Sequence, residues 1–106
     1  MKKEFRIKKT KEIDSIIKAK HSVGNKYFVI YKAKNNETSH FRFAISIGRK
    51  YGIAVERNLM KRRIREIIRN INPNNYDYVI VVKKASSELS FDEINQNLLN
   101  LFKRGV

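Results

Sequence analysis

The stretch from residue 55 to residue 71 constrains the fold of this chain more than any other part of its 106 residues. At about 100° per residue, its pattern predicts a helix with two contrasting faces. The apolar face consists of Met60, Ile64, Ile67, Ile68 and Ile71. A basic stripe lies about 140° away from it and consists of Asn58, Lys61, Arg62, Arg65 and Arg69. The helix must therefore bury one side in a core while the other side carries a line of positive charge.

Strands are predicted on both sides of this helix. Runs that alternate between apolar and polar residues, or that are rich in β-branched and aromatic residues, are typical of strands. The last run, at 78–82, is apolar at both parities, which predicts a strand covered on both faces. The predicted strands are a short edge strand at 21–23 and longer ones at 27–34, 41–47 and 78–82.

Two further helices complete the pattern. One is expected over 11–19 with Thr10 as its cap, and the other begins at a capping box of Ser90 and Glu93. The last helix should turn its apolar residues inward, namely Phe91, Ile94, Leu98, Leu101 and Phe102. The element order αβββαβα predicts an α+β sandwich, a mostly antiparallel sheet with helices packed on it. The length allows one domain over residues 1–106.

The charge distribution points to a polyanionic partner. The chain has 24 Lys and Arg against 10 Asp and Glu, a net charge of +14. Residues 49–69 carry a net +6 and residues 70–106 a net zero. Because the basic residues are interleaved with apolar ones, the positive surface should be folded rather than a disordered tail. Nucleic acid is the expected partner, with an anionic membrane surface as the alternative.

The composition also bears on the cellular location of the protein. No apolar run approaches the ~20 residues of a membrane span, and no apolar segment of a secretory signal follows the charged N-terminus. The absence of Cys excludes a disulfide framework and Cys-based zinc sites. A cytoplasmic location is therefore expected.

The residues offer no self-contained active site. His21 and His40 could serve as the acid and base of a metal-free ribonuclease, but nothing in the sequence brings them together, and two solvated surface histidines are the favoured interpretation. The carboxylates are scattered, and neither a phosphate-binding glycine loop nor a nucleophile elbow is present. The basic stripe is different, because Glu56 and Glu66 are too few to neutralise it. Nucleic-acid binding is favoured there over a solvated helix face.

One motif on this helix resembles a known family. The pattern Arg57-Asn58-x-x-Lys61-Arg62-x-x-Arg65-Glu66, after Gly52-Ile53-Ala54-Val55, resembles the RNR signature of the bacterial ribonuclease P protein subunit. The resemblance extends over essentially the whole chain. It includes the opening 5–9, the strand at 27–31, the segment 45–50 and the strand at 78–82.

The resemblance implies a fold and a function. The family fold is an α+β sandwich like the second domain of ribosomal protein S5, with a left-handed βαβ crossover that the usual handedness rule would not predict. The family's protein is a small basic cofactor of a large catalytic RNA, and together they remove the 5′ leader of precursor tRNA. Catalytic Mg²⁺ is held mainly by the RNA and the substrate. No membrane and no obligate protein partner are implied.

The resemblance also assigns residues. Those expected to bind the catalytic RNA are Arg57, Asn58, Lys61, Arg62 and Arg65, and Arg69 continues their stripe. The family's leader-binding cleft, between the first helix and the sheet, corresponds to Ile13, Ile17, Tyr31 and Lys50. Ile13 and Ile17 stand where relatives often carry Phe, so they lose stacking on a base worth ~1–3 kcal/mol. No protein-bound metal ligands are placed by the resemblance.

Two other functions remain as alternatives to that of a ribonuclease P subunit. A small ribosomal or other structural RNA-binding protein would share the charge, length and fold class, and the RNR motif argues against it. A metal-free nuclease that uses His21 or His40 would cleave RNA without an RNA partner.

Overall fold

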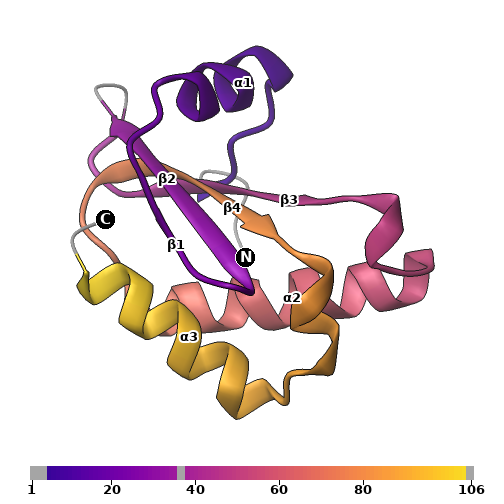
Figure 1. Cartoon of the computed structure of the whole chain (residues 1–106). Helices are drawn as coiled ribbons and strands as arrows, with labels where there is room; N and C mark the ends of the chain where they lie inside the picture. The colour runs from indigo at the N-terminus through magenta and orange to yellow at the C-terminus, as the bar shows by residue number, and fades with distance from the viewer. Residues whose placement is uncertain (1–4, 36–37, 105–106) are drawn as a thin grey trace.

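The computed structural model describes residues 5–35 and 38–104, which form a four-stranded sheet with helices on both faces (Figure 1). Short 3-10 turns, η2 (Arg49–Tyr51) and η3 (Lys84–Glu88), follow β3 and β4. The elements run in the order α1 (Thr10–Lys18), β1 (Ser22–Gly24), β2 (Phe28–Lys34), β3 (Arg42–Ile47), α2 (Ala54–Ile71), β4 (Tyr76–Val82) and α3 (Phe91–Lys103). This confirms the predicted order of helices and strands.

The strands lie in the order β1-β2-β4-β3. The β1–β2 and β2–β4 pairs are antiparallel, and the β3–β4 pair is parallel, so the sheet is mixed and mostly antiparallel. Helix α2 makes the crossover between the parallel neighbours β3 and β4. The central strand β4 is buried over most of its length, as a strand covered on both faces requires.

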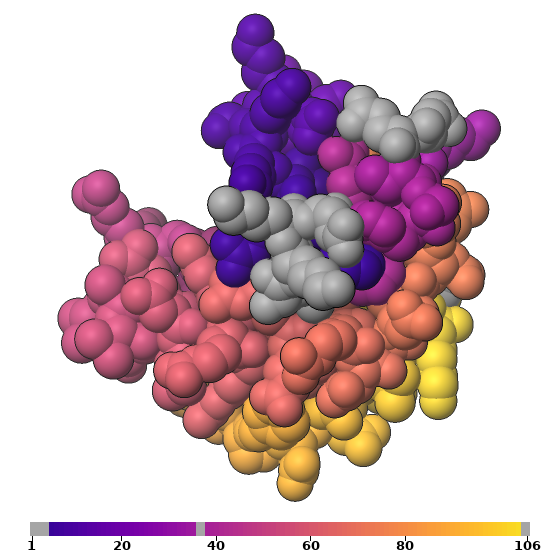
Figure 2. All heavy atoms as spheres, turned by 180° about the vertical axis from the view of Figure 1, so that it is seen from behind, coloured from indigo at the N-terminus to yellow at the C-terminus, as the bar shows by residue number. Residues whose placement is uncertain are grey.

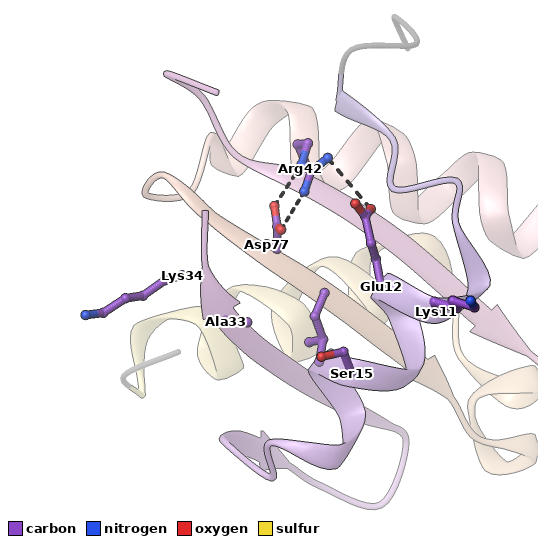
Figure 3. Close-up of a pocket in the computed structure, with 8 residues that line it drawn as sticks. Lys11, Glu12, Ser15, Ala33, Lys34, Arg42 and Asp77 are labelled. Atoms are coloured by element: carbon purple, nitrogen blue, oxygen red, sulfur yellow. Dashed lines mark hydrogen bonds and ion pairs between the residues drawn. The ribbon is translucent and has the colours of Figure 1, made fainter. Parts of the chain in front are cut away.

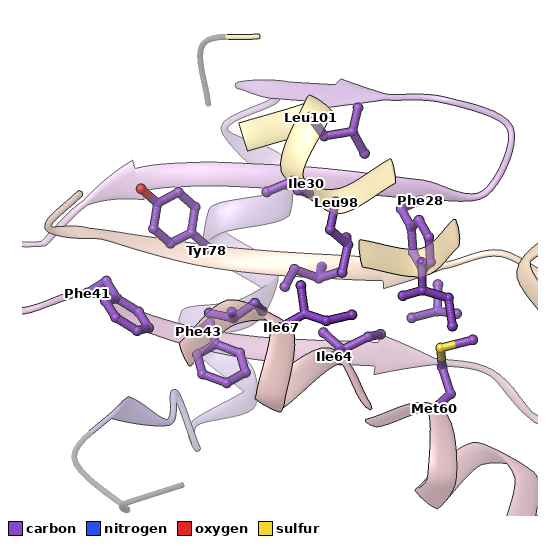
Figure 4. Packing of buried hydrophobic residues seen from close by; sticks show 14 of the residues in the cluster. Phe28, Ile30, Phe41, Phe43, Met60, Ile64, Ile67, Tyr78, Leu98 and Leu101 are labelled. Carbon is purple, nitrogen blue, oxygen red and sulfur yellow. The ribbon is translucent and has the colours of Figure 1, made fainter. Parts of the chain in front are cut away.

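The main core lies between the sheet and the pair α2 and α3 (Figure 4). Helix α2 contributes Met60, Ile64, Ile67 and Ile68, each at most 2 % exposed. Tyr78 and Ile80 of β4 point into the same cluster, whereas Val79, between them, packs on the opposite face. Because successive side chains of a strand point to opposite faces, β4 contributes to the clusters on both faces of the sheet.

Helix α1 covers the other face of the sheet (Figure 1). It packs on β2 and β4 through a smaller cluster whose buried members are Ile7, Ile16 and Val79. On this face, where α1 is the helix that packs on the sheet, Ala44 and Val81 are half-buried and Ser46 is exposed.

Two details of the helices differ from the prediction. Thr10 lies inside α1 and Lys9 is the N-cap residue, without a side-chain cap, so the expected Thr10 cap is wrong. Phe91 was expected to face the core but is 37 % exposed at the first position of α3, where the helix begins. The capping box is confirmed: Glu93 N donates to Ser90 Oγ, and Ser90 N donates to Glu93 Oε1.

The N-terminal segment covers the outer edge of β3. Arg6 forms an isolated parallel bridge with Phe43, and Ile7 N donates to Phe43 O at 3.0 Å. No helix or strand was predicted for this segment. Its effect is to bring Arg6 and Lys8 to the same side of the molecule as α2. In the described part of the chain, no helix is long and apolar enough to cross a membrane.

Candidate RNA interface

Helix α2 presents its basic stripe to solvent. Asn58, Arg62 and Arg69 are exposed, and Arg57, Lys61 and Arg65 are half-buried at the margins of the stripe. The opposite face of the same helix lies in the core. Figure 2, seen from behind, shows α2 lying across the molecule between the layer of α1 and that of α3. All six predicted RNA-binding residues therefore reach one surface.

Acidic residues do not neutralise this stripe. Within residues 5–35 and 38–104, the ion pairs closer than 4.0 Å join Arg42 to Glu12 and to Asp77, and none involves α2. Glu56 Oε1 instead accepts a hydrogen bond from Ile53 N at 3.2 Å and caps the start of the helix. The buried Nε of Arg57 has no hydrogen-bond partner among the described residues. The helix thus carries cationic donors that the protein itself does not use.

A groove continues the stripe toward the N-terminal segment. Arg6 and Lys8 form one wall, Lys61 and Arg65 form the other, and β3 residues form its floor, around a space of about 390 Å³. Burial, together with the positive charges of Arg6 and Arg62, lowers the pKa of Arg65. Arginine stays protonated at neutral pH, so the groove brings like charges together. A bound anion would relieve the repulsion between them. Guanidinium groups bind phosphate oxygens in a bidentate manner, which suits an RNA backbone.

A second groove, a pocket of about 430 Å³, lies between the first turns of α1 and the sheet. Ile16 lines it, and Ile13, Ile17 and Tyr31 pack on the cluster to which Ile16 belongs. The structure therefore brings three of the four predicted cleft residues together. Lys50 is not among them, because it lies on the exposed turn η2 that follows β3.

The strand register orders the sheet face on the side of α1 into three rows, the first of which lines the pocket. The row of Ala33, Asp77 and Arg42 lies at the end nearest the first turn of α1, because these residues and Lys11 line one pocket. The middle row contains Tyr31, Val79 and Ala44. The third row contains Val29, Val81 and Ser46. Successive rows are about 7 Å apart, since a strand advances 3.2–3.4 Å per residue.

Comparison with known proteins decides the family. The family model described as Ribonuclease P matches residues 1–105. The chain belongs to the ribonuclease P protein family.

Individual relatives agree with that membership. The ribonuclease P protein component of Acholeplasma laidlawii is 50 % identical over 105 residues, covering 95 % of this chain and 89 % of that protein. The Exiguobacterium protein of the same name is 42 % identical over 106 residues, covering 98 % and 92 %. The structure of the Staphylococcus aureus RNase P protein superposes with a TM-score of 0.89 at 34 % identity, covering 94 % of each chain. The Thermotoga maritima RNase P protein gives 0.84 at 34 % identity, covering 93 % and 96 %.

Membership in the ribonuclease P family makes the chain a subunit of an endoribonuclease that matures the 5′ ends of tRNA and works with an RNA subunit. These relatives support that function and not a ribosomal protein. The structure gives the two histidines separate surroundings. His40 packs on the ring of Phe5 with centroids 4.3 Å apart, with its Nδ1 2.8 Å from Phe41 O, whereas His21 is exposed beside β1.

Four residues beside the candidate surfaces were not among the residues predicted from the sequence. Arg6 and Lys8 join the stripe of α2 only through the bridge to β3. Their alternation with Phe5 and Ile7 is a strand-like signal that could have identified them. Val29 and Ser46 extend the floor of the α1 groove beyond Tyr31, and only the strand register aligns them.

Proposed function

We propose that the basic stripe of α2, extended by Arg6 and Lys8, is the surface that binds the catalytic RNA of ribonuclease P. The observation that carries this proposal is that the five stripe residues and Arg57 reach one face of α2 without an ion pair in the described ranges. Opposing phosphates would supply the missing negative charge, and releasing their counterions would favour binding. Asn58 adds a donor and an acceptor within the stripe.

The groove between α1 and the sheet is proposed to hold the single-stranded leader of precursor tRNA. Its floor runs from Tyr31 to the row of Val29, Val81 and Ser46, and Lys50 lies beyond the end of β3. Aromatic and apolar surface next to cations is what single-strand binders use, because every base has a face that can stack. Tyr31 is half-buried, so part of it remains open to a base.

The wall formed by α1 is expected to grip the leader weakly. Ile13 and Ile17 are half-buried in packing on the sheet and offer apolar contact without an aromatic ring. Stacking on an aromatic ring is worth about 1–3 kcal/mol per base, and an aliphatic side chain does not supply it. Tyr31 would then carry most of the stacking in this groove.

Cleavage itself is proposed to use Mg²⁺ held by the RNA subunit and the substrate, in the cytoplasm. In the described ranges, no group of three or more His, Asp or Glu side chains is placed to hold a metal ion. Glu12 and Asp77 are both engaged by Arg42. The proposed contribution of the protein is to bind RNA and to lower phosphate repulsion between the RNA subunit and its substrate.

A reconstituted cleavage assay tests this function. Precursor tRNA is incubated at modest magnesium with the protein alone, with the catalytic RNA alone and with both. We expect no cleavage by the protein alone and a strong increase over the RNA alone when both are present. Magnesium-dependent cleavage by the RNA-free protein, after rigorous removal of contaminating nuclease, would refute the proposal.

A further inference from the structure

Arg42 lies between two carboxylates that belong to different layers (Figure 3). Its Nε and Nη2 donate to the two carboxylate oxygens of Asp77 at 2.9 and 2.7 Å. Its Nη1 lies 3.8 Å from Glu12 Oε2. Arg42 and Asp77 are neighbours across the β3–β4 pair, whereas Glu12 comes from the first turn of α1. One guanidinium therefore connects the helix to the sheet.

The two halves of this connection differ in rigidity. The side chains of Arg42 and Asp77 are 13 % and 9 % exposed and form a bidentate pair, so they are fixed as part of the sheet. The side chain of Glu12 is 31 % exposed and reaches Arg42 over a longer distance. The contact to Glu12 is thus the adjustable half, and it sits in the wall of a pocket of about 430 Å³ between α1 and the sheet.

Helix α1 also packs on the sheet through apolar residues. Ile13, Ile16 and Ile17 belong to the cluster around Val79. Apolar packing is not directional, so it holds the helix down without fixing how its first turn is placed. Among the described residues, the Glu12–Arg42 contact is the ion pair that crosses from α1 to the sheet.

The charge balance makes an acid here unexpected. In a chain with a net charge of +14 that binds RNA, an acidic side chain beside a leader-binding groove weakens attraction for phosphates. Glu12 nevertheless lies one turn before Ile16, and its partner Arg42 lies one row from the row of Tyr31. A positioning role for Glu12 would offset this electrostatic cost.

We propose that Arg42 and Glu12 are positioning residues that clamp the first turn of α1 to the sheet and so set the width of the leader-binding groove. The proposal rests on the function proposed above. The clamp lies in the wall of the pocket at the row of Ala33, Asp77 and Arg42, and the leader is proposed to run from this pocket along the neighbouring rows of Tyr31 and Val29. Neither residue needs to touch the leader.

Loss of the negative charge and loss of the clamp predict opposite effects of Glu12→Gln on leader binding. Removing a negative charge raises the net charge to +15 and, by electrostatics alone, tightens binding of every RNA. Releasing the clamp instead weakens binding of the leader alone. The measurement is the affinity of the protein–catalytic RNA complex for precursor tRNA divided by its affinity for mature tRNA. We expect this ratio to fall about two- to five-fold, the range of a partly exposed ion pair.

Asp14→Asn is the matched control. Asp14 lies on the same helix two residues away, is exposed, and loses the same charge. We expect this variant to leave the ratio of precursor to mature affinity unchanged. The cleavage rate of bound precursor should stay the same in both variants, because the clamp positions the leader and not the scissile bond.

A distance measurement on the protein without RNA tests the clamp itself. The chain has no Cys, so spin labels can be placed on Thr10→Cys in the first turn of α1 and Asn100→Cys on α3, both exposed positions. We expect Glu12→Gln to broaden the distribution of label distances and Asp14→Asn to leave it unchanged. An unchanged distribution with Glu12→Gln would overturn the clamp, even if leader affinity fell.

Tyr31→Ala separates failure of the clamp from failure of the groove. If Tyr31→Ala lowers the affinity ratio and Glu12→Gln leaves it unchanged or raises it, the clamp is overturned while the groove stands. If neither variant lowers the ratio, the groove assignment and the clamp are both overturned. The clamp is supported if Tyr31→Ala and Glu12→Gln both lower the affinity ratio, Asp14→Asn does not, and Glu12→Gln broadens the distribution of label distances.

Discussion

Arg65 follows the fully buried Ile64 on α2, and it lines the groove that Arg6 enters from the N-terminal segment. Burial and the neighbouring positive charges lower its pKa, so the folded protein carries an unfavourable interaction at this point. Charged groups crowded in this way are common where a protein awaits a ligand of opposite charge. Arg6 therefore belongs with the proposed RNA-binding residues, although it is distant from α2 in sequence.

Replacing Arg6 tests that assignment. Arg6→Ala should weaken binding to the catalytic RNA and flatten the slope of log affinity against log salt by about 0.7–0.9, the value of one phosphate contact. Thermal unfolding of the free protein should stay the same or rise slightly, because a repulsive neighbour of Arg65 is removed. Lys103→Ala removes an exposed charge from α3 and is the control. Equal slope changes in the two variants would place Arg6 outside the interface.

Aromatic character in the α1 groove gives a second test at single residues. Tyr31→Ala should lower the affinity for precursor tRNA relative to mature tRNA, and Ile17→Phe should raise it by adding a ring that can stack on a base. The expected changes are up to about tenfold each, from about 1–1.4 kcal/mol of stacking. Affinity for the catalytic RNA is measured in parallel and should not change. If neither substitution changes the ratio of precursor to mature tRNA affinity, this groove is not the leader site.

Helix α3 shows how one element divides its residues between core and solvent. Leu98 is fully buried against the sheet, whereas Phe91, at the first position of the helix, is 37 % exposed. Leu98→Ala should lower the free energy of unfolding by about 2–5 kcal/mol, because it removes buried surface and leaves a cavity. Phe91→Ala should cost less than about 1 kcal/mol, since it lies outside the core. Denaturant unfolding measures both, and equal losses would mean that Phe91 packs inward after all.

The start of α3 also predicts a pH dependence. Hydrogen bonds with Ser90 lower the pKa of Glu93 from its ordinary value of 4.5. The folded state therefore favours the ionised carboxylate, and this stabilisation is present above about pH 4.5 and lost as pH falls through the lowered pKa. Glu93→Ala should lower the melting temperature at pH 7 and lower it much less at pH 3. A difference that does not depend on pH would exclude this capping interaction.

The elements themselves follow closely from the sequence. The predicted helix at 55–71 is observed at 54–71, because its apolar period continues until Asn72 adopts a left-handed conformation and ends it. The capping box of α3 is equally local, since its partners lie three residues apart. Such features depend on neighbours in sequence, so a periodic pattern is sufficient to predict them.

Features that depend on distant partners were not predictable in this way. Asp77 and Arg42 are 35 residues apart, and only the parallel pairing of β3 with β4 brings them into contact. The same holds for the alignment of Val29 with Ser46 and for the bridge that carries Arg6 to β3. The basic stripe could be predicted because it lies on one helix, whereas the groove and the clamp are assembled from several elements.

At the scale of the whole molecule, the excess positive charge lies in the first two thirds of the chain. That part includes the N-terminal segment, α1 and α2, whereas the last third, with β4 and α3, is neutral. Helix α2 belongs to both systems, with one face in the core and the other in the basic surface. This arrangement lets RNA contacts be removed without removing core contacts.

The salt dependence of RNA binding by the double variant Arg62→Ala, Arg65→Ala is the most direct test. Both side chains lie on the basic face, and Ala favours helix, so thermal unfolding of the free protein should be nearly unchanged. Affinity for the catalytic RNA should fall, and the slope of log affinity against log salt should flatten by about 1.4–1.8 for two lost phosphate contacts. The control is Lys103→Ala, Arg104→Ala, which removes two exposed charges at the end of α3 and should leave the slope unchanged. The contradicting result is a double variant that unfolds several degrees earlier while its salt slope stays fixed, because these arginines would then be structural.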